Sequence, residues 1–249
     1  MATPMGLLVA GFDYSPVAED EFNDWYDTEH IPERARTPGF INCERWLGVE
    51  DPKISIATYD LASLAVLQTP AYRAIAGANL SPWSKRVTAS CRRICRFEAE
   101  QTLPGNQAAP ATGAAAMLLF AMNPLPEAEA DFNAWYDQEH VPALAAVPGC
   151  LAARRFRIHN AVSEGNHRYL ALYHLIAPDV AQDCVLIVAD RDSPADLPRV
   201  ALTWLKCAGI DHSTPYRGIA VVKSDVAGTA AGRGNIAVYR PVTLGATRR

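Results

Sequence analysis

The residues with the clearest capacity for acid–base chemistry occur in a stretch that the chain contains twice. The first copy, Phe22 to Pro32, has the sequence FNDWYDTEHIP, and the second, Phe132 to Pro142, has the sequence FNAWYDQEHVP. Eight of the eleven positions are identical, and the two copies lie 110 residues apart. Both copies contain a Glu-His pair, and histidine takes or gives a proton near neutral pH. The repetition indicates a duplicated unit that carries the chemistry.

Helical spacing would place a phenol near each of these histidines. A tyrosine lies four residues before each one, so the two side chains can touch on a helix. The glutamate directly before each histidine points about 100° away from it. A histidine at the C-terminal end of a helix is also biased towards its cationic form by the helix dipole, which suits a proton donor or an anion-binding group. The predicted catalytic residues are His30, His140, Tyr26, Tyr136, Glu29 and Glu139.

A second set of residues has the chemistry of substrate binding. Arg45 and Arg155 share the 110-residue offset and lie in predicted strands, where an arginine facing a cavity binds a carboxylate bidentately. Tyr59 and Tyr173 each share a strand face with a small alanine, which leaves room for a ligand or for a close-packed helix. His174 occurs in the second unit alone and makes the two units chemically unequal if it lines a cavity. The predicted substrate-binding residues are Arg45, Arg155, Tyr59, Tyr173, Trp25, Trp135 and His174.

Each candidate also has a purely structural interpretation. A histidine at a helix end commonly caps the helix, and a tryptophan commonly packs on a sheet. The glutamates can hold the following turn, the tyrosines can pack with a hydrogen-bonded hydroxyl, and the strand arginines can face solvent. A surface Glu-His pair has no evident reason to be retained in two halves that have otherwise diverged. We therefore keep the functional interpretation beside the structural one.

The elements predicted around the first copy follow the order β-α-β-β-α-β. Short apolar runs predict strands, and Ser15-Pro16 followed by acidic residues predicts the start of a helix. We expect Pro32 to end that helix. The predicted elements are a strand at 6–12, a helix at 17–30, strands at 41–49 and 54–60, a helix at 61–76 that is interrupted near Thr69-Pro70, and a strand at 92–99. This order is that of a ferredoxin-like α+β unit.

The second unit repeats the same pattern with more divergence. Its predicted elements are a strand at 116–122, a helix at 125–140, strands at 151–158 and 168–174, a helix at 197–207, a strand at 216–223 and an edge strand at 236–242. The segment between the units is rich in Pro, Gly and Ala and lacks hydrophobic periodicity, which is typical of a linker. We therefore predict a first ferredoxin-like unit at 1–100, a linker at 101–115 and a second unit at 116–249.

Composition narrows the classes of function. The net charge of −4 gives no reason to expect nucleic acid as a partner, and no stretch reaches the roughly 18 apolar residues of a membrane span. The six cysteines lack metal-site spacing, which predicts free thiols in a reducing compartment and neither a metal site nor a disulfide framework. The N-terminus lacks the basic region of a signal peptide. We expect a cytoplasmic protein without a membrane partner.

A strand, a helix carrying F-N-x-W-Y-D-x-E-H-[IV]-P, a P-G-[FC] turn and a strand with an arginine together resemble the dimeric α/β-barrel superfamily, particularly its EthD-like and stress-responsive members. The resemblance covers residues 5–100 and, more weakly, 115–223. It implies two ferredoxin-like units whose sheets join into a barrel with the helices outside, here as a pseudo-dimer within one polypeptide. It also implies that ligands sit in the barrel, with His30 and His140 near its mouth.

The superfamily includes cofactor-free monooxygenases, isomerases, cyclases, lyases and haem enzymes. The sequence has no glycine-rich nucleotide fingerprint after a strand, so we predict an enzyme without a cofactor. Its histidines would act as general acid or base on an aromatic or polyketide-like acid, in a lyase or isomerase step such as decarboxylation, dehydration or rearrangement. Two alternatives stay open, a non-catalytic ligand-binding or structural barrel and a haem enzyme. A small molecule is the expected partner, with further association of pseudo-dimers as an option.

Overall fold

The computed structural model describes residues 2–48, 51–110, 113–124, 126, 129–162, 167–177, 180, 217–219 and 238–241. The predicted helix at 197–207 lies outside the described residues. Among the residues that the structure describes, no helix is long and apolar enough to cross a membrane.

The first half of the chain has its strands close to the predicted positions. Its elements are β1 (Gly6–Asp13), α1 (Glu19–Asp24), η1 (Trp25–His30), α2 (Ile31–Ala35), β2 (Phe40–Gly48), β3 (Ile54–Leu61), η2 (Leu64–Gln68), α3 (Pro70–Arg73), η3 (Gly77–Asn79), α4 (Pro82–Ser90) and β4 (Arg92–Leu103). β4 runs further than predicted, so the first three positions of the predicted linker belong to a strand.

The second half repeats the first part of this order. Its elements are β5 (Ala116–Met122), α5 (Glu129–Trp135), η5 (Tyr136–His140), α6 (Val141–Ala145), β6 (Cys150–Val162), β7 (Tyr169–Leu175), β8 (Arg217–Ile219) and β9 (Val238–Pro241). Within the sheet, the strand order β2-β3-β1-β4 of the first half is matched by β6-β7-β5-β8 in the second. The two halves therefore share one topology as far as the structure describes them.

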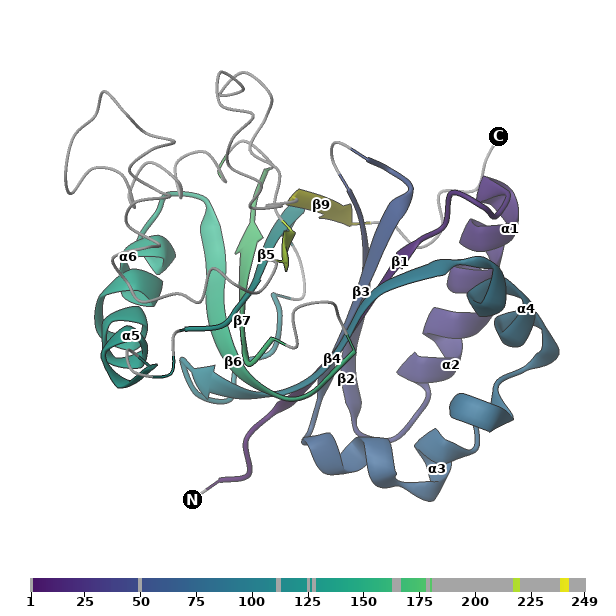
Figure 1. The fold of residues 1–249 in the computed structure, drawn as a ribbon, viewed down its shortest axis with the longest axis horizontal. Coiled ribbons are helices and arrows are strands. Elements are labelled where there is room, and N and C mark those ends of the chain that lie inside the picture. The colour runs from purple at the N-terminus through teal and green to yellow at the C-terminus, as the bar shows by residue number, and fades with distance from the viewer. Residues whose placement is uncertain are drawn as a thin grey trace.

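Seven strands form one antiparallel sheet that curls into a half-barrel (Figure 1), in the order β2-β3-β1-β4-β6-β7-β5. The two halves join where β4 pairs with β6. The short strand β9 pairs with β2 on one side and with β5 on the other. β9 is therefore not the edge strand that the sequence predicted, since it bridges the two ends of the seven-strand order.

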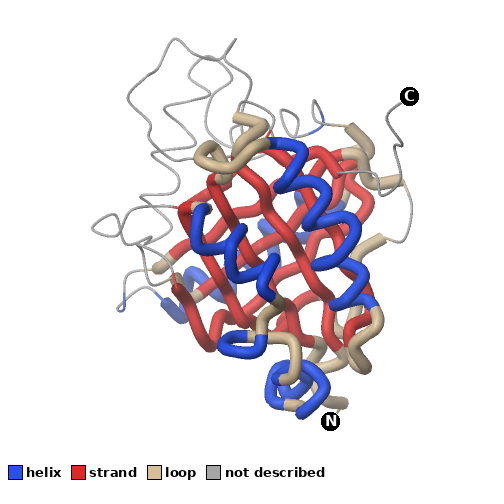
Figure 2. The backbone as a smooth tube through the Cα atoms, turned by 90° about the vertical axis from the view of Figure 1, so that its right-hand side faces the viewer, coloured by secondary structure: helices blue, strands red, loops and turns tan. Residues whose placement is uncertain are grey.

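The curled sheet separates an inner core from two outer cores. Alternate residues of each strand face opposite sides, and the inner faces of both halves meet in one apolar cluster that includes Leu7, Val9, Phe97, Leu119 and Leu172. The helices cover the outside of the strands (Figure 2) and pack there in two separate clusters, around Trp25 in the first half and Phe132 in the second. A side chain on these strands thus lies either in the barrel interior or under the helices.

The repeated stretch forms a π-helical turn in both halves, which the sequence did not predict. The N–H of Ile31 bonds the carbonyl of Tyr26 five residues earlier, and the N–H of Val141 bonds that of Tyr136. The helix then continues to Ala35, so the prediction that Pro32 ends it is wrong. Pro32 lies in the first turn of α2, directly after the π-helical turn.

The predicted helix at 61–76 is present only as two short helical turns, η2 and α3, and the interruption predicted near Thr69-Pro70 is confirmed, because Thr69 has an extended backbone between them. Thr69 caps α3 by accepting a hydrogen bond of 3.3 Å from the N–H of Tyr72. The longer helix of this region is α4, and Ser81 caps it by accepting a bond of 2.9 Å from the N–H of Ser84. Ser81 followed by proline was the sequence signal for this start.

The turn after each repeated stretch depends on one glycine. Gly39 and Gly149 both have φ of 92°, a left-handed conformation that side chains disfavour. A Cβ atom on Gly39 would lie 2.5 Å from Val66 Cγ2, and one on Gly149 would lie 2.9 Å from Val180 Cγ2. These turns fix the start of β2 and β6, the strands that carry Arg45 and its counterpart.

Candidate active site

The first copy of the repeated stretch packs its aromatic rings around His30. The ring centroid of His30 lies 4.6 Å from that of Trp25, 5.3 Å from that of Tyr26 and 6.4 Å from that of Tyr59 on β3. Trp25, Tyr26 and Tyr59 are buried, while His30 keeps part of its surface exposed. We call His30, Tyr26 and Tyr59 the first-half site; it lies between η1 and the outer face of the sheet.

Three polar atoms of the first-half site lack a partner. The hydroxyls of Tyr26 and Tyr59 and the Nδ1 atom of His30 are all buried, and none makes a hydrogen bond of ordinary length within the described part of the chain, although the two hydroxyls lie close enough to affect each other's pKa. Buried polar groups are nearly always hydrogen-bonded, and exceptions commonly mark a bound water, a ligand or a functional group. The side chains of the first-half site can therefore still form hydrogen bonds to a bound molecule.

The second copy builds a similar second-half site from His140, Tyr136 and Tyr173. The ring of His140 lies 4.6 Å from that of Tyr136 and 4.7 Å from that of Trp135, centroid to centroid. Here the two tyrosine hydroxyls lie 3.1 Å apart and share a hydrogen bond. The phenols thus satisfy one another, which makes the two halves unequal although they carry the same residue types.

The protein surroundings keep both histidines neutral. Burial, followed by the nearby Arg34 guanidinium, lowers the pKa of His30 well below its ordinary value of 6.5. Burial, followed by Arg155, lowers the pKa of His140 to about 3. The predicted bias towards the cation is wrong, because neither residue ends its helix: the chain continues as α2 and α6. At neutral pH both imidazoles are therefore in the neutral form, and the lowered pKa makes each a weaker base than a free imidazole.

The strand arginines lie under the helices and hold them. Arg45 donates hydrogen bonds of 2.9 Å to Asn23 Oδ1 and 3.1 Å to Asp27 Oδ1, and its guanidinium carbon lies 4.9 Å from the ring centroid of Tyr26. Arg155 contacts the equivalent pair, Asn133 and Asp137, in the second half. This contact explains why the asparagine and the aspartate recur in both copies.

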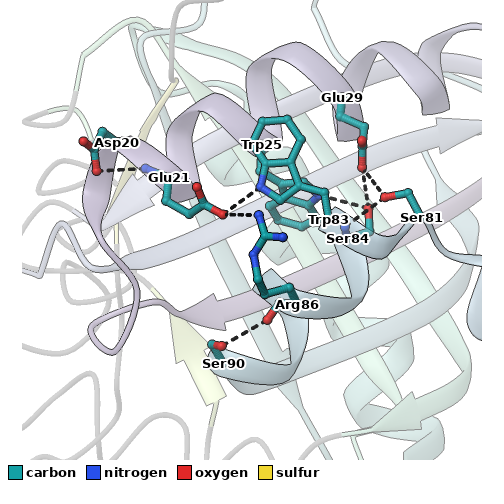
Figure 3. A network of polar contacts seen from close by, with 9 residues as sticks. All are labelled: Asp20, Glu21, Trp25, Glu29, Ser81, Trp83, Ser84, Arg86 and Ser90. Atoms are coloured by element: carbon teal, nitrogen blue, oxygen red, sulfur yellow. Dashed lines mark hydrogen bonds and ion pairs between the residues drawn. The ribbon is translucent and has the colours of Figure 1, made fainter.

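Glu29 connects the repeated stretch to α4 (Figure 3). It accepts hydrogen bonds of 2.5 Å from Ser81 Oγ and 3.0 Å from Ser84 Oγ. Ser84 Oγ in turn accepts a bond of 2.9 Å from the indole N–H of Trp25. Through these contacts Glu29 and Trp25 hold η1 against α4. The sequence did not indicate the two serines that take part in them. Glu139, in the second half, is exposed.

His174 does not join the other predicted site residues. It points into the barrel interior, where its strand position faces Ala152 of β6 and Met117 of β5. Sequence reasoning missed three further polar residues on the same inner face, Glu44, Asp60 and Arg154. The available signal was that Glu44 and Arg154 occupy equivalent positions of the two repeats, 110 residues apart.

The described residues do not fit a haem at either repeated histidine. A haem bound to one of these imidazoles would meet a tryptophan and a tyrosine ring, which lie within 5.3 Å of it between centroids. Both tryptophans are also held in place, Trp25 by its bond to Ser84 and Trp135 by packing against the second-half core. We therefore derive no step through a haem.

No protein-family model matches the chain, and no curated protein matches its sequence. Solved structures do share its fold. An anthrone oxidase-like protein superposes with a TM-score of 0.59 at 14% identity, over 96% of this chain and 95% of that one. A putative monooxygenase from Fusobacterium nucleatum gives 0.60 at 10% identity, over 98% and 94%. A putative chlorite dismutase gives 0.54 at 14% identity, over 98% and 97%. The chain therefore has the dimeric α+β barrel-type fold of these proteins.

Proposed function

We propose that this protein is a small-molecule enzyme in which His30 acts as a general base at the first-half site. The observation that carries the proposal is the set of three unpartnered polar atoms, Tyr26 OH, Tyr59 OH and His30 Nδ1, which lie buried together within the described residues. We further propose that the two halves are ferredoxin-like units joined as a pseudo-dimer, which matches the repeated strand order.

The substrate class that fits these groups is an aromatic or polyketide-like acid. The buried aromatic rings of Trp25, Tyr26 and Tyr59 beside His30 favour a flat, apolar body. Burial raises the pKa values of the phenols of Tyr26 and Tyr59, so both remain protonated and can donate hydrogen bonds to a substrate oxygen.

The proposed reaction begins with proton transfer to neutral His30 from a carbon next to the substrate carbonyl. Negative charge then develops on the carbonyl oxygen, where the two phenols donate hydrogen bonds that stabilise it. Return of the proton to another carbon completes an isomerisation, and transfer to a departing hydroxyl group completes a dehydration. Both outcomes balance without a co-reactant, which fits a cofactor-free lyase or isomerase.

The experiment that tests this proposal first finds the ligand and then measures turnover. Purified protein is incubated with a mixture of phenolic and polyketide-like acids, and bound and converted compounds are identified by mass spectrometry. Tyr59→Phe removes one proposed donor and keeps the ring, so we expect it to lower kcat with little loss of protein stability. A protein that binds and converts none of these compounds, in contrast, would support the non-catalytic alternative.

A second candidate function is oxidation of a similar substrate by molecular oxygen. The names of two fold neighbours, an oxidase-like protein and a putative monooxygenase, favour it. His30 would again remove the first proton, the resulting carbanion would bond to molecular oxygen to give a hydroperoxide after protonation, and cleavage of its O–O bond with loss of water would leave a carbonyl on that carbon. Oxygen uptake separates the two functions, because the lyase or isomerase proceeds unchanged under anaerobic conditions and the oxidation stops.

A further inference from the structure

The barrel interior contains polar side chains that the first-half and second-half sites do not use, and four of these lie on equivalent strands of the two halves. Glu44 and Asp60 come from the first half, and Arg154 and His174 come from the second. They occupy equivalent positions of the repeats, since Glu44 and Arg154 lie 110 residues apart and Asp60 and His174 lie 114 apart. The first half thus places two acidic side chains on the inner faces of its strands, and the second half places two basic side chains at the equivalent positions. We call these four residues the interior cluster.

One edge of the Arg154 guanidinium is fully used. Its Nη1 atom donates a hydrogen bond of 2.7 Å to Asp60 Oδ1 and one of 3.2 Å to the carbonyl of Gln107. Asp60 Oδ2 accepts a bond of 2.7 Å from the N–H of Ala109. Residues 107–109 of the predicted linker therefore lie against this pair.

The other edge of the same guanidinium is unused. Arg154 is 0% exposed, yet its Nε and Nη2 atoms have no hydrogen-bond partner in the described parts of the chain. These two N–H groups point in parallel, which is the geometry by which arginine binds both oxygens of a carboxylate. Two buried N–H donors without acceptors lower the stability of the folded protein. A bound water or ligand that accepts hydrogen bonds from them would remove this cost.

His174 lies on the neighbouring strand, where its ring contacts Trp46 and its Nε2 atom is within ion-pair distance of Glu44, but it has no hydrogen bond of ordinary length. It is 0% exposed, and neither ring nitrogen is hydrogen-bonded to any described residue. Glu44 Oε2 lies 3.6 Å from His174 Nε2, which is too long for a hydrogen bond. His174 faces Ala152, and Arg154 faces Leu172, so the two side chains are diagonal neighbours on one face of the β6–β7 pair.

We propose that the interior cluster is a second ligand site, which binds a small carboxylate between the free edge of Arg154 and the ring of His174. The carboxylate accepts two hydrogen bonds from Nε and Nη2 of Arg154 and one from His174. A metal ion is disfavoured as occupant, because the described residues contain no group of three His, Cys, Asp or Glu side chains that could hold one.

Charge balance predicts that binding takes up a proton. Asp60 already offsets the charge of Arg154, so a bound carboxylate adds a negative charge beside Glu44. Burial lowers the pKa of His174 below its ordinary value of 6.5, so its ring is neutral at neutral pH before a carboxylate binds. Three charged groups also act on it, namely Glu44 from β2, Arg154 from β6 and Asp60 from β3. A protonated His174 would offset the added charge, and carboxylate binding should therefore be tighter at pH 6 than at pH 8.

The test uses acetate and benzoate as probes, with acetamide as the neutral counterpart of acetate. Binding to the full chain is followed by calorimetry and by the imidazole resonances of His174 in nitrogen-15-labelled protein, assigned with His174→Gln. We expect at least one carboxylate to bind and shift these resonances, with tighter binding at pH 6 than at pH 8. Acetamide should not bind.

Three variants separate the cluster from the rest of the protein. His174→Gln should weaken carboxylate binding by about tenfold or more, as loss of one charge-assisted hydrogen bond predicts. The double variant Arg154→Gln with Asp60→Asn should abolish it, and it removes both charges together so that neither is left buried alone. Arg157→Gln should bind as the wild type does, because Arg157 is exposed on the same strand. The proposal would be overturned if neither acetate nor benzoate binds, in which case water would satisfy the interior cluster. It would also be overturned if acetamide binds as tightly as acetate, or if the double variant binds carboxylates as tightly as the wild type.

Discussion

Arg154 donates a hydrogen bond of 2.7 Å to Asp60, and the two residues come from opposite halves of the chain. Their side chains are 1% and 3% exposed, so this is a buried ion pair inside the barrel. The pair links β3 of the first half to β6 of the second across the apolar interior. A buried charge that loses its partner is strongly destabilising, even where the intact pair adds little net stability.

Replacement of Asp60 by alanine should therefore lower the free energy of unfolding by about 3–5 kcal/mol, because it leaves the Arg154 guanidinium buried without a counter-charge. The measurement is urea denaturation followed by fluorescence. Glu19→Ala is the matched control, since it breaks the exposed pair with Lys53 and should change stability by about 0–1 kcal/mol. Equal effects of the two variants would show that the buried pair does not hold the halves together.

Replacement of Glu29 by alanine should destabilise the protein by about 1–3 kcal/mol, because two serine hydroxyls of the α4 region lose their common acceptor. Denaturation with urea again gives the value. Thr28→Ala, one residue earlier and exposed, should stay within about 0.5 kcal/mol of the wild type. A Glu29→Ala variant that is fully stable yet inactive would return Glu29 to the catalytic role that the sequence predicted.

Stability should fall as the pH is lowered from 7 towards 4. His140 has a pKa of about 3 in the folded protein, against about 6.5 when unfolded, so the unfolded state binds the proton more readily between these values. Urea denaturation at several pH values in this range measures the slope. The variant His140→Asn should have a shallower slope than the wild type. An identical slope would mean that His140 is not kept neutral by burial.

The helix and strands that carry the repeated stretch were predictable because their signals are local. Alternation in residues 54–60 and the acidic start before Phe22 each depend on near neighbours in the sequence. The π-helical turn at Trp25–His30 was not predictable, since the aromatic spacing fits an α-helix equally well. The turn becomes evident only from the bond between Ile31 and Tyr26.

The site was predictable in its residue types but not in its arrangement. The repeated Tyr and His do lie together, yet the asparagine and aspartate of the same stretch recur because they bind Arg45 and Arg155. The contact between Arg154 and Asp60 depends on which strand faces turn inwards and on how β4 pairs with β6. Neither fact is encoded within one stretch of sequence, because both arise when the two halves fold together.

The most direct test of the proposed function is the turnover of His30→Ala with the substrate found by the binding screen. Single-site loss of a general base should lower kcat by about 10²-fold or more. His140→Ala should cost less, because the phenols beside His140 already satisfy one another. Circular dichroism and urea denaturation confirm that each variant is folded. Full turnover by both single variants and by the double variant would contradict the proposal that these histidines carry the chemistry.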